Sequence, residues 1–589
     1  MSPAGGRDPA GDELVSAALV VLGGAAVLSA VLRAAASLAT WLAGLPDPTG
    51  GIASGLGVLA RPLHPGTAVG APDLSPISYW AVAAVMVAGV GTVAALVVSR
   101  WQGRRRRPDP RRLDGVATGS DIARTATGRV LRRRAGTLRP SLTGRVEPRQ
   151  VGYLLGTARG RRVWASVEDS ILVLGPPRSG KGLHLVTNFI LDAPGAVLTT
   201  STRPDNLTIT MRARERVGPV AVFDPQHLAP GLPAGLRWSL VRGCEDPLTA
   251  MIRAAGLAAS TGLGGGGVEN GGFWEGKARA AIQALLHAAA LDGRDARSLY
   301  RWALSPASAG DAVRVLASTS QAADGWAESL DSMIQSDPRT RDSIWQGVGL
   351  ALAALADPRV LDAVTPRESE SFDPGAFLEQ RGTLFLLATG AGAGASAALV
   401  AAFVEDLVET ARRMAARSPG ARLDPPVLLA LDEIGTLAPL PSLPTLMAEG
   451  GGTGLTTVPV LQSLAQAREK WGPENAGAIW DASIVKVVLG GSANAKDLQD
   501  VAALLGERDE PTVAVSRDTH GGRSYQTSLR RVPVMPPDVL RTLPFGTAVT
   551  LLRSAPPIVT NLRAWTARPD AKTLRADRGA IEAMLRSGA

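Results

Sequence analysis

One stretch of eight residues constrains the fold of this chain more than any other. Gly175-Pro-Pro-Arg-Ser-Gly-Lys181-Gly182 has the spacing G-x-x-x-x-G-K of a phosphate-binding loop. The apolar run 171–174 before it is typical of a buried strand, and the apolar-rich run 183–190 after it is typical of a helix. Strand, glycine-rich turn and helix in this order predict an α/β nucleotide-binding domain and argue against a chance match in a glycine-rich chain.

The residue types in this loop suit phosphate chemistry. Gly175 and Gly180 let the backbone curl so that its N–H groups point at phosphate oxygens, and the helix N-terminus adds its positive dipole end. Lys181, one of only six lysines, supplies a point charge for the β- and γ-phosphates. Gly182 stands where serine or threonine would offer a hydroxyl to Mg²⁺, so one ligand is unassigned. The expected nucleotide-binding residues are Gly175, Pro176, Pro177, Arg178, Ser179, Gly180, Lys181, Gly182 and Leu183.

A partner motif lies about 250 residues downstream. The run 427–431, Val-Leu-Leu-Ala-Leu, ends in Asp432 and Glu433, as a buried strand with two carboxylates at its tip would. Asp432 is the expected Mg²⁺ residue, and Glu433 is expected to orient or deprotonate the attacking water. An apolar run that ends in Asp-Glu is weak evidence on its own. It becomes strong evidence for a nucleotide site when it lies on a second strand of the sheet that carries the phosphate loop.

Two other strand tips carry polar residues. The next apolar run ends in Gln462, which we expect either to sense the γ-phosphate or to be an ordinary strand-terminal residue. Asp224 follows the run 220–223 and has the same two interpretations. The expected catalytic residues are therefore Lys181, Asp432, Glu433 and Gln462, with Asp432 also the expected metal residue.

Two long uncharged runs near the N-terminus predict a membrane unit over residues 1–100. Residues 14–32 and 79–99 are each long enough to cross a hydrocarbon core of ~30 Å. The acidic flank at residues 8–13 and the second run argue against a signal peptide. We expect spans at about 14–45 and 79–99, joined by an external loop over 46–78.

The positive charge of the chain is concentrated in one segment. Residues 100–149 hold fifteen arginines against four acidic residues, whereas the rest of the chain carries a net charge of about −2. Arginines directly after the second span predict that this end is cytoplasmic, and two spans then place the N-terminus inside too. The expected location is the plasma (inner) membrane, multi-pass, with the C-terminal bulk cytoplasmic. The arginines are expected to contact membrane lipids, which we favour over DNA although the two are compatible.

The single cysteine, Cys244, cannot form an intrachain disulfide, so nothing requires an oxidising compartment. After the basic segment, strand-like runs alternate with helical ones, which predicts a mostly parallel sheet covered on both faces. The alternation stops between Phe223 and Thr383, where helical periodicity prevails. The glycine-rich stretch 261–272 lacks a lysine and a preceding strand, so we expect a flexible loop there.

These patterns give an expected domain organisation. It comprises a basic linker at 101–150, a nucleotide-binding domain at 151–245 and 377–565, an inserted all-α domain at 246–376, and a C-terminal tail at 566–589. The expected strands are 171–174, 196–200, 220–223, 383–388, 427–431, 457–461 and 484–489.

Taken together, the elements resemble the TraG-type coupling proteins of type IV secretion and conjugative DNA transfer, which are RecA-like P-loop ATPases. The resemblance rests on the two spans, Gly-Pro-Pro-Arg-Ser-Gly-Lys-Gly, Leu431-Asp-Glu-Ile-Gly435 and Gln462-Ser-Leu-Ala-Gln466, and covers roughly residues 10–565. Glycine after the loop lysine also occurs in that family, so Gly182 is not strong evidence of inactivity.

The resemblance implies a membrane-anchored homo-hexamer with a RecA-like domain, an inserted all-α domain and a two-helix transmembrane unit. Such a protein recruits a DNA–relaxase substrate to a type IV secretion channel and uses ATP, with Mg²⁺, to drive DNA transfer. The implied partners are DNA, single-stranded and bound without sequence preference, relaxase or relaxosome proteins, channel proteins and membrane lipids. The all-α domain would meet the transfer complex, and Arg381, Arg468 and Arg508 are candidates for an arginine finger.

Two alternatives remain open. An FtsK-like DNA translocase shares the membrane spans and the RecA-like motor. Such a protein usually carries a long linker before the motor and a winged-helix domain at its end, and residues 567–589 are too few for that domain. A nucleotide-gated receptor that docks substrates without hydrolysis is kept open by Gly182. The sequence has no zinc ligand set and no clear helix-turn-helix, so sequence-specific DNA reading is not expected.

Overall fold

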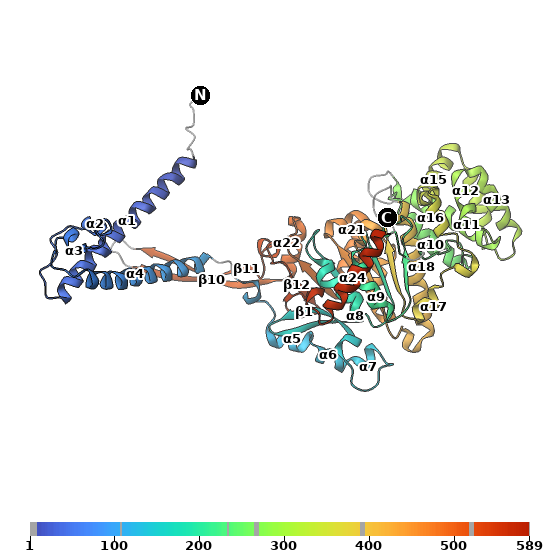
Figure 1. Cartoon of the computed structure of the whole chain (residues 1–589). Coiled ribbons are helices and arrows are strands. Elements are labelled where there is room, and N and C mark those ends of the chain that lie inside the picture. Colours follow the sequence, from blue (N-terminus) through green and yellow to red (C-terminus); the bar gives the residue numbers. More distant parts are fainter. Residues whose placement is uncertain are drawn as a thin grey trace, which may run out of the picture. The chain divides into compact units, whose positions relative to one another are not determined.

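The structure, a computed structural model, describes residues 9–105, 109–232, 235–263, 270–388, 395–517 and 523–587. The chain forms two compact units, Met1–Pro108 and Asp109–Ala589, which we describe separately (Figure 1). Six residues of the predicted glycine-rich loop, 264–269, and Arg106 and Arg107 of the basic segment lie outside the described residues.

The first unit contains two helices that are long and apolar enough to cross a membrane, over Leu22–Leu42 and Pro76–Val97. This finding suggests membrane anchoring. The predicted external loop contains two short helices. The helices of this unit are α1 (Pro9–Leu42), α2 (Ser54–Ala60), α3 (Pro65–Val69) and α4 (Pro76–Arg105).

Arg33 interrupts the apolar surface of α1, and the loop satisfies its charge. Its Nε donates to the carbonyl of Gly50 and its Nη2 to the carbonyl of Pro48, both at 2.5 Å. Charged residues within membrane helices are costly unless backbone carbonyls or opposite charges pair with them. The hydroxyl of Tyr79 in α4 donates to the carbonyl of Leu32 at 3.1 Å, so α1 and α4 pack together.

The second unit is built on an eleven-stranded sheet with the strand order β2-β1-β13-β12-β9-β3-β8-β7-β4-β6-β5. From β9 to β5 every neighbouring pair is parallel, and β12, β13, β1 and β2 continue the sheet in antiparallel fashion. The strands are β1 (Gly152–Ala158), β2 (Arg161–Ser166), β3 (Ile171–Leu174), β4 (Val197–Ser201), β5 (Val220–Phe223), β6 (Thr383–Leu387), β7 (Val427–Asp432), β8 (Leu455–Leu461), β9 (Val485–Leu489), β12 (Thr547–Leu552) and β13 (Ile558–Asn561).

The seven strands expected from the sequence are the seven parallel ones, so the prediction of a mostly parallel sheet is confirmed. The four antiparallel strands were not expected. The sheet is covered on both faces, because successive residues of one strand pack into different cores. Leu172 and Leu174 of β3 belong to one core, whereas Ile171 and Val173 belong to the other with Phe189.

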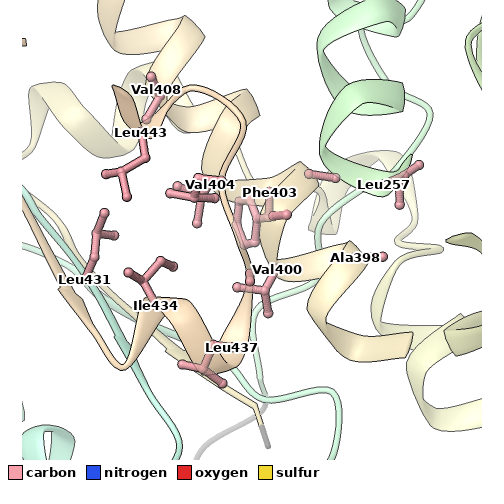
Figure 2. Packing of buried hydrophobic residues seen from close by; sticks show 14 of the residues in the cluster. Leu257, Ala398, Val400, Phe403, Val404, Val408, Leu431, Ile434, Leu437 and Leu443 are labelled. Carbon is pink, nitrogen blue, oxygen red and sulfur yellow. The ribbon is translucent and has the colours of Figure 1, made fainter. Parts of the chain in front are cut away.

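Helix α18 (Ala395–Arg417) joins the sheet to the helical region. Figure 2 shows Val400, Phe403 and Val404 of this helix facing Leu431 of β7 and Ile434, which follows it. Asp406 of the same helix makes a buried ion pair with Arg253 of α10 at 2.8 Å. Helix α18 therefore packs both against β7, the strand that carries Asp432, and against α10 of the helical region.

Between β5 and β6 the described residues contain helices and no strand, as the sequence predicts for 246–376. Five of these helices begin with proline after an Asp or Ser whose side chain accepts a backbone N–H, a strong helix start. The helices are α10 (Pro247–Ala259), α11 (Gly271–Leu291), α12 (Ala296–Leu304), α13 (Pro306–Ser318), α14 (Trp326–Ile334), α15 (Pro338–Ala351), α16 (Pro358–Ala363) and α17 (Pro374–Glu379). Their status as a separate domain stays a prediction.

The rest of the second unit holds shorter helices that pack on the sheet. The predicted linker forms three of them, and the predicted tail forms α24, which buries Ile581 against Leu207 and Met211 of α9 (Figure 1). These helices are α5 (Gly119–Thr125), α6 (Gly128–Arg133), α7 (Ala135–Leu138), α8 (Thr187–Asp192), α9 (Asp205–Glu215), α19 (Ile434–Leu437), α20 (Leu443–Thr453), α21 (Leu464–Ala482), α22 (Ala495–Leu504), α23 (Pro537–Arg541) and α24 (Ala571–Ser587).

A long hairpin, β10 (Glu507–Arg517) and β11 (Arg523–Pro533), forms a second sheet of its own. Its register pairs Pro511 with Leu529 and Val515 with Tyr525, so these exposed apolar residues share one face. No element was expected here from the sequence.

Candidate nucleotide-binding site

The predicted phosphate loop lies between β3 and a helix that opens with a π-helical turn over Gly182–Val186 and continues as α8. Gly180 has φ +88°, and a Cβ added there would lie 2.7 Å from His184 Nδ1 and 2.9 Å from the ring of Phe545. Both its conformation and its surroundings therefore require glycine. Arg178 also adopts a left-handed conformation, with φ +63°. The loop thus has the tight curl that phosphate binding needs.

Lys181 points back across the loop. Its Nζ donates to the carbonyl of Gly175 at 2.6 Å, and the residue is 8% exposed. Burial lowers the pKa of Lys181, while the negative charges of Asp432 and Glu433 oppose that shift. The hydroxyl of Ser179 is buried and has no hydrogen-bond partner among the described residues. An unpaired buried hydroxyl in this loop suits a phosphate oxygen as its partner.

The strand order brings the two motifs together. Strand β8 lies between β3 and β7 and is parallel to both, with Leu174 beside Leu461 and Asp432 beside Val460. The carboxyl ends of the three strands therefore meet at one edge, where ligands of such sheets bind. Gly175, Gln462 and Asp432 sit at that edge.

Asp432 is held from two directions. Its carboxylate Oδ2 accepts a hydrogen bond from Asn206 Nδ2 at 3.3 Å, and its backbone carbonyl accepts one from Thr200 Oγ1 at 2.8 Å. Burial and then repulsion from Glu433 raise the pKa of Asp432 to about 6, although Lys181 lowers it. Two carboxylates beside one lysine leave excess negative charge, and oxygen ligands with such charge suit Mg²⁺.

Glu433 follows directly at the end of β7 with φ +52°, a left-handed conformation that is costly for a residue other than glycine. Its Oε2 accepts a hydrogen bond from Thr202 Oγ1. Backbone strain of this kind is concentrated at functional sites. The turn and the hydrogen bond together fix the direction of the carboxylate.

Gln462 and Asp224 occupy different environments. Gln462 lines a small cavity with Gly175, so it lies beside the phosphate loop, and its γ-phosphate role stays a prediction. The carboxylate of Asp224 accepts the backbone N–H groups of Leu228 and Ala229 at 2.8 and 2.7 Å. These bonds match the ordinary structural interpretation of Asp224.

Two of the three arginine-finger candidates already pair within the chain. Arg468 pairs with Asp497 at 2.5 Å and Arg508 with Glu510 at 3.1 Å. Arg381 lies in the turn before β6 with φ +58°. The arrangement does not single out any one of them.

Sequence reasoning missed three site residues at the end of β4 and directly after it: Thr200, Thr202 and Asn206. They reach the site because β4 is the neighbour of β7. A polar run directly after a predicted parallel strand was the available signal, since such strand ends face the ligand edge.

The chain was compared with known proteins. Residues 426–545 match a family model described as the TraM recognition site of TraD and TraG. No curated protein was found to match by sequence. Among solved structures, the bacterial conjugative coupling protein TrwBdeltaN70 is similar, with 19% identity, a TM-score of 0.51, and 76% of this chain and 94% of that chain covered. TrwB in complex with the non-hydrolysable ATP analogue ADPNP is also similar, with 19% identity, a TM-score of 0.51 and coverages of 75% and 93%.

At this identity the solved structures show the fold, and they confirm the predicted RecA-like P-loop architecture. The family model independently matches the segment that carries Asp432, Glu433 and Gln462. The two comparisons agree in supporting the resemblance to TraG-type coupling proteins.

Proposed function

We propose, from the TraD/TraG match of residues 426–545 and the coupling-protein fold of the second unit, that this chain is a membrane-anchored coupling ATPase. It recruits a DNA–relaxase substrate to a type IV secretion or conjugation channel and uses ATP hydrolysis to drive DNA transfer. The observation that carries the proposal is the strand order: β8 lies between β3 and β7 and is parallel to both, so the phosphate loop and the Asp432–Glu433 pair, far apart in sequence, meet at one edge of the sheet.

Each residue has a distinct role in hydrolysis. The backbone N–H groups of residues 178–183 and the Lys181 amine bind the phosphates of ATP, and Gln462 senses the γ-phosphate. Glu433, oriented by Thr202, accepts the proton of the attacking water. Mg²⁺, which Asp432 would hold, supplies charge neutralisation at the phosphate oxygens.

The proposed setting is the plasma (inner) membrane, with the chain crossing twice and both its N-terminus and its C-terminal bulk in the cytoplasm. The two apolar helices and the arginines that follow the second one support this orientation. The resemblance to coupling proteins supports a homo-hexamer and partners among relaxosome and channel proteins.

A cationic surface near β2 supports DNA as a partner. Two cavities, of about 430 and 470 Å³, share Arg162 and Trp164 in their linings. Arg129, Arg132 and Arg161 line the second cavity, and among the described residues neither they nor Arg162 makes an ion pair with a carboxylate. Unpaired arginines around a partly exposed indole suit the phosphates and bases of a single strand.

Replacing Arg161 and Arg162 together by alanine should weaken single-stranded DNA binding about tenfold at ~0.1 M salt and make it less salt-dependent. Two lost phosphate contacts lower the slope of log K against log salt by about 1.4. Fluorescence anisotropy with labelled oligo(dT) measures both quantities. Arg575→Ala with Arg578→Ala, two exposed arginines of α24, is the matched control. An unchanged slope in the Arg161/Arg162 variant would count against this surface.

The proposed function is tested by ATP hydrolysis of the full-length chain in nanodiscs, with and without single-stranded DNA. We expect DNA to raise the rate several-fold and Lys181→Ala to abolish both rates. No stimulation by DNA, together with no effect of Lys181→Ala, would instead indicate the docking receptor that Gly182 keeps open. Stimulation by duplex DNA alone would indicate the FtsK-like translocase.

A further inference from the structure

The phosphate loop lacks one oxygen that such loops usually provide. At Gly182 a serine or threonine hydroxyl would reach Mg²⁺, and glycine offers none. A Cβ built on Gly182 would have a single neighbour within 4 Å among the described residues: Asn206 Oδ1, at 3.8 Å. An oxygen from α9 therefore lies beside the place where the missing side chain would start.

Asn206 is held rigidly in that place. It is 3% exposed, in the first turn of α9, and its Nδ2 donates to Asp432 Oδ2 at 3.3 Å. Since a carboxylate only accepts, the amide must turn its nitrogen to Asp432 and its oxygen toward the loop. Thr187 Oγ1, buried in the helix after the loop, donates a hydrogen bond to that oxygen at 3.5 Å. One side chain thus links the phosphate-loop helix to the acidic strand end.

The chemistry of this oxygen matches the role. Carboxamide oxygens are hard ligands of the kind that divalent cations such as Ca²⁺ and Mg²⁺ accept in proteins. Asp432, on the other side of the same amide, is the expected metal carboxylate. The site therefore retains two oxygen-bearing side chains where a conventional loop would have a hydroxyl and a carboxylate.

We infer that the Asn206 carboxamide oxygen replaces the hydroxyl absent at Gly182 and serves as a ligand of the Mg²⁺ that accompanies the nucleotide. The inference rests on the proposed function only in requiring that this site binds a metal–nucleotide complex. It explains how a loop with glycine after the lysine keeps a complete metal site.

A purely structural role is the competing explanation, because the bond to Asp432 also ties α9 to β7. The two explanations differ in what a hydroxyl restored at position 182 would do. Serine at 182 has room, since the nearest neighbour of its Cβ is in ordinary contact, and it supplies a metal ligand without restoring the link to Asp432.

The test is Mn²⁺ binding, with Mn²⁺ in place of Mg²⁺, measured by electron paramagnetic resonance on the full-length protein in nanodiscs with saturating ADPNP. We expect Asn206→Ala to weaken Mn²⁺ binding at least tenfold while ADPNP binding in EDTA is unchanged. Adding Gly182→Ser to Asn206→Ala should bring the Mn²⁺ affinity back to within about threefold of the wild type. Asn188→Ala is the matched control: among the described residues this buried amide donates hydrogen bonds to the carbonyls of His184 and Arg563 and accepts one from Arg568, whereas Asn206 bonds to Asp432.

An unchanged Mn²⁺ affinity in Asn206→Ala would overturn the inference. A weakened affinity that Gly182→Ser fails to restore would overturn it too, because Asn206 would then only position Asp432. Failure of the wild type to bind ADPNP or Mn²⁺ would be a different result, since it removes the proposed function itself.

Discussion

Replacing Glu433 by glutamine is expected to lower ATP hydrolysis at least 100-fold while nucleotide binding stays within about twofold of the wild type. Glutamine keeps the size and the polar contact of the side chain, but its amide cannot take a proton from water at neutral pH. The left-handed turn at position 433 and the hydrogen bond from Thr202 place this group after the strand that carries Asp432. The variant should therefore trap bound ATP.

Single-turnover hydrolysis and equilibrium binding of ADPNP measure the two effects separately. Glu449→Gln, at an exposed position of α20, is the matched control and should leave both unchanged. Thr202→Val removes only the hydrogen bond that orients Glu433, so we expect a smaller loss of about tenfold. Hydrolysis by Glu433→Gln within threefold of the wild type would show that another group activates the water.

Replacing Asp432 by asparagine is expected to abolish Mg²⁺-dependent hydrolysis and, in EDTA, to stabilise the protein at pH 7.5. The pKa of Asp432 is about 6 in the folded protein, above the ordinary value, because burial and Glu433 disfavour its charge. A raised carboxyl pKa contributes stability that is complete below about pH 4 and is lost as the pH rises through 6. Neutral asparagine avoids this loss, which amounts to up to about 3 kcal/mol at pH 7.5.

Thermal unfolding in EDTA at pH 7.5 and pH 4 tests the prediction. The variant should melt at a higher temperature than the wild type at pH 7.5, and the difference should shrink towards pH 4. Adding Mg²⁺ and ADPNP should then stabilise the wild type more than the variant, because only the wild type has the carboxylate that the cation pairs with. A variant that melts lower at pH 7.5 would contradict this account of the charge at Asp432.

A loss of folding stability from the charge of Asp432 is understandable at a site that binds a cation. Carboxylates kept close together in a buried position destabilise a protein until a cation arrives, and function then conflicts with stability. The hydrogen bond from Asn206 and the nearby charge of Lys181 offset only part of that repulsion.

Much of the second unit could be predicted from local patterns. The seven parallel strands are mostly buried, so most of each strand reads as an apolar run, although β4 ends in polar residues and β9 contains Lys486. Strands β1, β2, β12 and β13 and the hairpin mix polar and apolar residues, so they have no comparably continuous apolar signal. In the tail, α24 has few apolar residues, and Ile581 is buried because it packs against α9.

The sequence by itself determined the chemistry of the phosphate loop and of Asp432 and Glu433, because phosphate and metal binding restrict residue types at short, fixed spacings. Tertiary structure alone decided that β4 lies beside β7, which brings Thr202 to Glu433 and Asn206 between Asp432 and Gly182. Strand order is settled by the packing of the whole sheet, and no local pattern encodes it. Asp224, at the tip of the edge strand β5, accepts hydrogen bonds from the backbone of its own turn.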